Sequence, residues 1–140
     1  MGMTQQSAVI NRPPSEVWAA IRNFHDMSWC PTVITDLQPV GDKNGTEPGA
    51  KRILNTAIHE TFQSVDEEGM TFSYQITDGP SPISKDEVKN YIGVVKLTAD
   101  TDGTLVDWSS SWEGMDEEGY EFCHPIYMAL LADMKASLEG

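Results

Sequence analysis

Three polar residues in the middle of the chain, Arg52, Glu60 and Tyr74, have the types and neighbours that acid–base chemistry needs. Residues two apart share one face of a strand, so Glu60 shares a face with Ile58 and Phe62. Two apolar neighbours predict that this face is buried. Burial raises the pKa of a carboxyl group and makes it a usable acid or base near neutrality. The pattern is also typical of a structural Arg52–Glu60 ion pair, since such pairs perturb pKa values as well.

Tyr74 alternates with Phe72 and Ile76, which predicts that the three share one strand face. A buried tyrosine needs a partner for its hydroxyl group. Two roles fit this residue: it orients a ligand carbonyl or protonates a developing enolate, or it is a core residue bonded to a backbone carbonyl. With Glu60 as general base, and Tyr74 and Arg52 stabilising an enolate oxygen, aldol cyclisation and dehydration become feasible.

Large aromatic residues predict the walls of a site for a flat or polycyclic molecule. Trp108 and Trp112 lie four apart on one strand face, where Trp108 also fits an ordinary core, and Trp29 lies in a connector. Tyr91 joins this set unless a bulge at Gly93 changes the register. The residues that we expect to line the site are Trp29, Phe62, Phe72, Tyr74, Tyr91, Trp108, Trp112, Tyr127 and Met128.

The histidines and cysteines form no metal-binding spacing. His25, His59 and His124 make no HExxH motif, and Cys30 and Cys123 make no CxxC pair, so we expect no metal and no other cofactor. His124 fits either a general acid–base role or a helix cap at the surface. The two cysteines are expected to pack as small apolar residues without forming a disulfide.

Composition limits the classes of partner. The chain has 140 residues, a net charge of −13 and a pI of about 4.3. Such a charge repels phosphate backbones and anionic lipid headgroups, so we expect neither nucleic-acid binding nor membrane association. No apolar run approaches the roughly 20 residues of a membrane helix, which argues against membrane insertion. The length predicts one domain over residues 1–140, and the N-terminus lacks signal-peptide features, so we expect a cytoplasmic protein.

The order of elements places these side chains on a sheet between two terminal helices. Apolar residues at helical spacing follow Pro13–Pro14, and a longer stripe marks residues 117–138, where a helix either starts near Pro125 or kinks there. Strands joined by short turns predict an antiparallel meander. The strands are expected at residues 5–11, 33–40, 50–55, 58–66, 70–77, 87–99 and 105–112.

Two glycine- and proline-rich loops, residues 41–49 and 78–84, are expected either to gate a cavity or to be ordinary turns. The long helix would pack along its whole apolar stripe on the sheet. A strongly twisted meander would then curl around this helix and leave a hollow between the two.

At this point the chain resembles the START-like, helix-grip superfamily (SRPBCC), and within it the polyketide cyclase/dehydrase-like group. The resemblance implies an α+β helix-grip fold, in which a seven-stranded antiparallel sheet wraps around a long C-terminal helix and a hydrophobic cavity. It spans nearly the whole chain. The residues that carry it are Pro13-Pro14-Ser15-Glu16-Val17-Trp18, Trp29-Cys30-Pro31, Gly49-Ala50-Lys51-Arg52, Glu60, Asp66, Tyr74, Asp78-Gly79-Pro80-Ser81-Pro82, Trp108 and Trp112.

Three functions remain open, because one fold hosts many activities. The first is binding of a small hydrophobic ligand, aromatic, polycyclic or lipid-like, in the cavity. The second is a cyclase/dehydrase-like enzyme that uses Glu60, Tyr74 and Arg52. The third is a partner-binding domain, which needs an exposed apolar patch. We prefer the first, with the protein a monomer or a homodimer.

Overall fold

Seven strands and two helices make up the computed structural model, which describes residues 1–140. The first half of the chain carries β1 (Gly2–Ile10), α1 (Pro14–Ile21), β2 (Leu37–Val40) and β3 (Lys51–Leu54). The second half carries β4 (Ile58–Asp66), β5 (Thr71–Asp78), β6 (Lys89–Asp100), β7 (Gly103–Glu113) and α2 (Asp116–Glu139).

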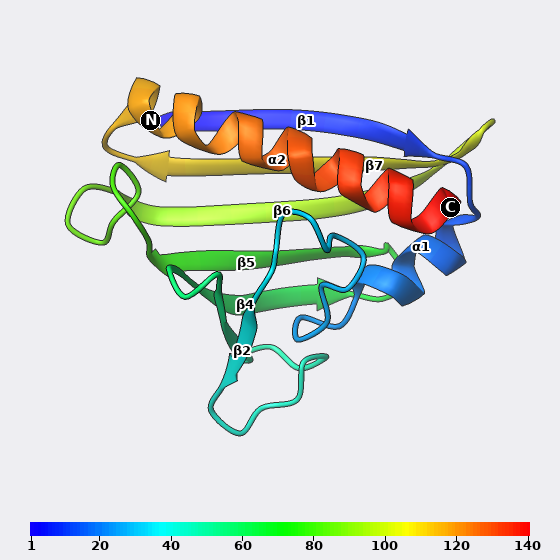
Figure 1. The fold of residues 1–140 in the computed structure, drawn as a ribbon, viewed down its shortest axis with the longest axis horizontal. Coiled ribbons are helices and arrows are strands. Elements are labelled where there is room, and N and C mark those ends of the chain that lie inside the picture. Colours follow the sequence, from blue (N-terminus) through cyan, green and yellow to red (C-terminus); the bar gives the residue numbers. More distant parts are fainter.

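The strands form one antiparallel sheet in the order β1-β7-β6-β5-β4-β3-β2. In Figure 1, α2 crosses one face of this sheet beside β1 and β7. The connector, residues 22–36 between α1 and β2, passes over the same face next to α2. The predicted helix-grip fold is therefore confirmed, and the concave face of the sheet is covered by a helix and by an irregular segment.

Buried and half-buried residues alternate along β7, and the buried face of the strand packs toward α2. Every second residue of β7 from Thr104 to Trp112 is buried, and the residues between them are half-buried. Trp112 fits under the start of α2 because Gly2 and Gly119 have no side chain. A Cβ atom at Gly2 or at Gly119 would stand 2.2 or 2.7 Å from the indole Nε1. This close approach locks the first turns of α2 onto the sheet.

The long helix begins at Asp116 and runs through Pro125, so it does not start at the proline. Most of its predicted apolar stripe is buried, including Cys123, Tyr127 and Leu130. Tyr120 is an exception, because it is 43% exposed and stacks on His124 instead of packing on the sheet. No helix of the protein combines the length and the apolar character that crossing a membrane requires.

The strand expected at residues 33–40 is only partly right, because β2 starts at Leu37. The backbone N–H groups of Val33 and Ile34 donate to the carbonyl of Cys30, which makes a turn. The buried Asp133 of α2 holds that turn, since its Oδ2 accepts hydrogen bonds from the backbone N–H groups of Thr32, at 2.8 Å, and Val33, at 3.2 Å. A side chain of α2 thereby replaces the ladder that a strand would have formed.

Removal of the Asp133 carboxylate should release the connector. Asp133→Ala leaves the part-buried N–H of Thr32 without a partner and leaves that of Val33 with only the carbonyl of Cys30, which should lower the free energy of unfolding by about 1–3 kcal/mol. Amide exchange at Thr32 and Val33 should accelerate more than exchange in the sheet. Asp133→Asn is the control, because its amide oxygen still accepts one of the bonds and should give an intermediate effect. Equal exchange in all three proteins would contradict this assignment.

Candidate functional site

A partly open cavity lies between the concave face of the sheet, α2 and the connector. All but two of its 16 lining residues are hydrophobic, and Arg52 and Glu60 are the two exceptions. The lining comes from five strands, from α2, from the connector and from the loop before β6. It consists of Met27, Ile34, Arg52, Leu54, Ile58, Glu60, Tyr74, Ile76, Ile83, Tyr91, Trp108, Phe122, Cys123, Ile126, Tyr127 and Leu130.

The cavity is narrow in this structure. The space between its lining atoms is about 440 Å³, but only about 40 Å³ of it can hold the centre of a water molecule. That is room for a few waters, since one water needs roughly 10–15 Å³ by this measure. Met27 and Ile34 also line a hollow on the outer surface of the connector. These two side chains therefore lie between the cavity and this hollow, as Ile76 and Tyr91 lie between the cavity and a second surface hollow.

The Arg52–Glu60 pair forms one polar end of the cavity. The two residues lie directly opposite each other on β3 and β4, and both side chains are at least 94% buried. Arg52 donates from Nε at 2.8 Å and from Nη2 at 2.6 Å to the same carboxylate oxygen, Oε1 of Glu60. Its Nη1 donates to the carbonyl oxygen of Phe24 at 2.9 Å, and its guanidinium lies 3.6 Å from the centroid of the Phe24 ring.

The second carboxylate oxygen of Glu60, Oε2, has no hydrogen-bond partner in the protein, although the residue lines the cavity. Burial raises the pKa of Glu60 above the ordinary value of 4.5, and the charge and hydrogen bonds of Arg52 act in the opposite direction. The site thus holds a desolvated carboxyl group with one oxygen anchored and one oxygen free.

A chain of hydrogen-bonded hydroxyl groups, from Tyr74, Tyr127, Tyr91 and Ser110, is the second group of polar atoms at the cavity. Trp108 donates its indole N–H to the Tyr74 hydroxyl at 2.9 Å, and the Tyr74 and Tyr127 hydroxyls are 2.9 Å apart. The Tyr127 and Tyr91 hydroxyls are 2.6 Å apart, and Tyr91 donates to Ser110 at 3.1 Å. These residues come from β5, β6, β7 and α2, so the chain ties the helix to the sheet.

Burial raises the pKa of Tyr74, Tyr91 and Tyr127 well above 10, so these hydroxyls remain neutral. Gly93 makes room for this cluster, because a Cβ atom there would lie 2.2 Å from Cζ of Tyr74. Gly93 pairs regularly with Tyr74, and the irregularity of β6 lies between Lys89 and Ile92. The bulge considered at Gly93 is therefore absent.

Six of the residues expected at the site lie at the cavity: Arg52, Glu60, Tyr74, Tyr91, Trp108 and Tyr127. Arg52 and Glu60 form a pair across the sheet. Of the two alternatives left open for Tyr74, the one with a backbone carbonyl partner does not hold, because its hydroxyl bonds to the side chains of Tyr127 and Trp108.

The other five residues lie elsewhere. Trp29 packs on Trp108 with ring centroids 6.2 Å apart, and Trp112 stacks on Tyr91 at 5.3 Å, so both support lining residues from behind. Phe62 and Phe72 pack against each other, away from the cavity lining. Met128 is 46% exposed and points away from the sheet, because it follows Tyr127 by about 100° around the helix.

The lining residues that sequence reasoning missed are mostly aliphatic, and they lie on strands, on α2 or on irregular segments. Phe122 and Ile126 flank the Cys123–Tyr127 stripe at i, i+4 spacing, and this spacing is the signal that could have found them. Met27, Ile34 and Ile83 come from segments without a repeating pattern. Of the two loops expected as gates, residues 78–84 supply Ile83, whereas residues 41–49 contribute nothing to the lining.

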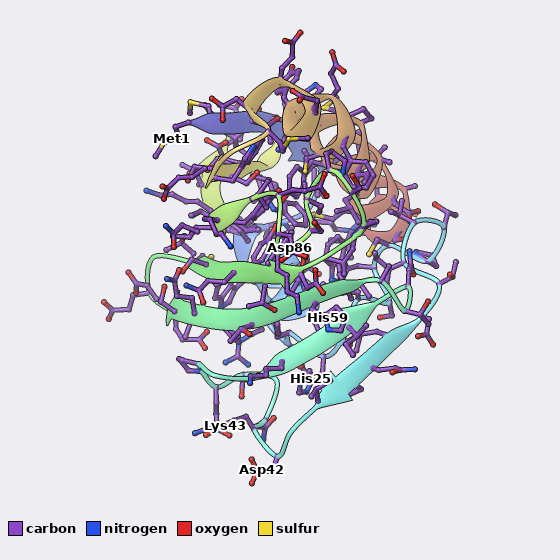
Figure 2. The ribbon with its side chains drawn as sticks, turned by 90° about the vertical axis from the view of Figure 1, so that its left-hand side faces the viewer. Met1, His25, Asp42, Lys43, His59 and Asp86 are labelled. Atoms are coloured by element: carbon purple, nitrogen blue, oxygen red, sulfur yellow. The ribbon has the colours of Figure 1, made fainter.

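The loop of residues 41–49 extends away from the body of the protein, and Asp42 and Lys43 mark its tip in Figure 2. His124 bonds through Nδ1 to Gln6 at 2.9 Å, outside the cavity lining. Both cysteines are free thiols, and burial raises the pKa of Cys30 to about 12. No three histidine, cysteine, aspartate or glutamate side chains gather closely enough to hold a metal ion.

The profile of one protein family, described as polyketide cyclase / dehydrase and lipid transport, matches residues 1–139. This chain belongs to that family. A solved protein from Nitrosospira multiformis is 39% identical to it, with a TM-score of 0.92 over 96% of this chain and 94% of that one. No curated protein matches the sequence.

More distant structures share the architecture. The protein XoxI from Bacillus cereus is 24% identical, with a TM-score of 0.80 over 99% of this chain and 97% of that one. Ara h 8.0201 is 15% identical, with a TM-score of 0.74 over 96% and 94%. These likenesses show the helix-grip fold alone. The family and the fold together fit a role in binding hydrophobic ligands.

The Arg52–Glu60 pair predicts a pH-dependent effect of mutation. Arg52→Met leaves Glu60 buried without its counter-charge, which should lower the free energy of unfolding by about 3–5 kcal/mol near pH 8. Burial raises the pKa of the Glu60 carboxyl in the folded protein above its value in the unfolded chain. The folded state is therefore relatively more stable at low pH, where the carboxyl is protonated, and this stability is lost as the pH rises through the pKa of the folded state. The penalty of Arg52→Met should therefore shrink as pH falls toward about 5.

Urea unfolding across this pH range measures the penalty, and the double variant Arg52→Met/Glu60→Leu is the control. Replacement of both charges by apolar side chains of similar size should be neutral or stabilising. It should also remove the extra pH dependence, because no buried carboxyl remains. A single-variant penalty that does not change with pH would contradict the assignment.

Proposed function

We propose that this protein binds a small hydrophobic molecule in the cavity between the sheet and α2. The observation that carries the proposal is the combination of an apolar lining with two groups of polar side chains, the Arg52–Glu60 pair and the tyrosine hydroxyls, around one space. Ligand sites are typically concave and apolar, with a few convergent polar groups that fix orientation. Burial of apolar ligand surface would supply the affinity, at roughly 25 cal/mol per Å².

Binding of anything larger than a few waters requires the cavity to widen. Met27 and Ile34 are the side chains proposed to move, since they line both the cavity and the hollow on the connector, whereas Ile76 and Tyr91, which line a second surface hollow, are held in β5 and β6. They lie on the connector, which has no helix or strand and is held to α2 at Thr32 and Val33. Methionine is also the most adaptable of the apolar side chains. Ligand entry is therefore proposed at the connector.

A cavity-filling variant tests this proposal with naphthalene, an aromatic probe without polar groups. Leu130→Trp adds bulk at a lining position that is 5% exposed, and it should weaken naphthalene binding at least about tenfold. Met128→Trp is the matched control on the same helix. It adds the same ring at a position that is 46% exposed, so its affinity should stay within about twofold.

Isothermal titration and native mass spectrometry measure this binding, and circular dichroism checks that both variants fold. Native spectra of freshly purified protein also reveal any co-purified ligand as a mass lost on denaturation. Equal loss of affinity in both variants would contradict binding in the cavity, and so would naphthalene binding that Leu130→Trp leaves unchanged.

A second candidate function is cyclase/dehydrase-like catalysis, and the free Oε2 of Glu60 favours it. A desolvated carboxylate with a raised pKa suits a general base, and the remaining Arg52 N–H groups would stabilise an enolate oxygen. The Tyr74 hydroxyl, which we expected from the sequence to share this task, is already bonded to Tyr127 and Trp108, so the enolate role is proposed for Arg52 alone.

Glu60→Gln tests this candidate. It preserves the shape of the side chain but removes the base, so turnover of a poly-β-keto thioester should fall by at least about 100-fold. Binding of naphthalene should change by only a few-fold. Turnover that survives in Glu60→Gln would exclude Glu60 as the base.

A further inference from the structure

We infer that the cavity selects a neutral hydrophobic molecule that carries a hydroxyl group, and that this hydroxyl binds Oε2 of Glu60. The inference deepens the proposed function and rests on it, because it names the chemical class of the ligand. It starts from one unusual atom: a carboxylate oxygen on a residue that is 6% exposed, next to an apolar cavity, with no protein donor.

The hydrogen bonds of Arg52 are directed away from that oxygen. A guanidinium group has five N–H donors. Two of them converge on Oε1 of Glu60 and a third reaches the carbonyl of Phe24. One N–H on each Nη atom is left over. A ligand group that approaches Oε2 therefore contacts a strong acceptor, and the remaining N–H donors belong to Arg52 on the adjacent strand.

A hydroxyl group satisfies this environment better than other small polar groups. It donates to Oε2 and can accept a remaining N–H from Arg52. It also accepts a hydrogen bond if Oε2 carries a proton, so it fits Glu60 in both protonation states. Oε2 is accessible from the cavity, where water can reach it. An ether or a ketone that displaces this water offers no donor to the carboxylate and leaves the acceptor unpaired, which is unfavourable.

Charge excludes two further classes. Arg52 and Glu60 together carry no net charge, and no other ionised side chain lines the cavity, because the tyrosine hydroxyls stay neutral. A ligand carboxylate would face the Glu60 carboxylate, and an ammonium group would be desolvated beside the Arg52 guanidinium. Both would bury an uncompensated charge.

The tyrosine end does not compete for the ligand hydroxyl. Each phenol has one proton. Since Tyr91 donates to Ser110, Tyr127 must donate to Tyr91 and Tyr74 must donate to Tyr127. The indole of Trp108 then donates to Tyr74. All these protons are engaged inside the protein, so this end contacts the ligand through ring surfaces and orients it weakly.

Four probes that share one ring system test the inference: naphthalene, 2-naphthol, 2-methoxynaphthalene and 2-naphthoate. Titration calorimetry should show 2-naphthol binding about 10- to 100-fold more tightly than naphthalene, the range of one hydrogen bond to a charged group. The methyl ether should gain nothing over naphthalene, and the carboxylate should bind most weakly. Equal affinity of 2-naphthol and its methyl ether would overturn the inference.

The variant Arg52→Met/Glu60→Leu separates this inference from the proposed function. The ratio of its affinities for 2-naphthol and naphthalene should fall to about one, because its cavity contains no carboxylate. Preference for 2-naphthol that persists in this variant would place the hydroxyl elsewhere and overturn the assignment to Glu60. If naphthalene binds and the hydroxyl adds nothing in the wild type, only the inference fails. If none of the four probes binds, the proposed function fails with it.

Discussion

The burial of one charged pair constrains much of the rest of this structure. Removal of a guanidinium and a carboxylate from water costs several kcal/mol per ion, and only close geometry with further hydrogen bonds offsets that cost. Arg52 meets this requirement by contacting β4 through Glu60 and the connector through the carbonyl and ring of Phe24. The register of β3 against β4 and the start of the connector are therefore coupled, and both border the cavity.

The tyrosine chain also borders the cavity, and it fixes the position of α2 against the sheet. A helix that packs only by apolar contacts can rotate or slide, whereas hydroxyl contacts at 2.6 and 2.9 Å fix Tyr127 between Tyr91 and Tyr74. Such a network is stable only when every member is satisfied. Two sets of directional bonds, those of the Arg52–Glu60 pair and those of the tyrosine chain, thus fix the positions of the lining side chains. This explains why the side chains do not collapse into the cavity.

The sequence predicted those parts of the site that depend on strand periodicity. Arg52 and Glu60 flank a short turn, so their pairing across two strands follows from alternation, and the same rule places Tyr74 beside Phe72. The rotation of α2 about its own axis is harder to predict from the sequence than the alternation of a strand. Met128 and Tyr127 are neighbours in sequence, and only packing on the sheet decides that Tyr127 faces the cavity. Asp133 was not predicted at all, because its partners lie about 100 residues earlier, on a turn without periodicity.

The arrangement of satisfied and free polar atoms sets what the cavity can discriminate. An apolar wall distinguishes ligands weakly, since one methylene changes affinity by only about 1–3 kcal/mol. An acceptor at the cavity wall without a protein partner discriminates more strongly, because a ligand that displaces water from it and lacks the matching donor leaves that acceptor unpaired. In this protein the tyrosine hydroxyls are mutually satisfied and Oε2 of Glu60 is not. Shape therefore comes from the aromatic walls and the helix, while chemical selectivity is concentrated on a single oxygen atom.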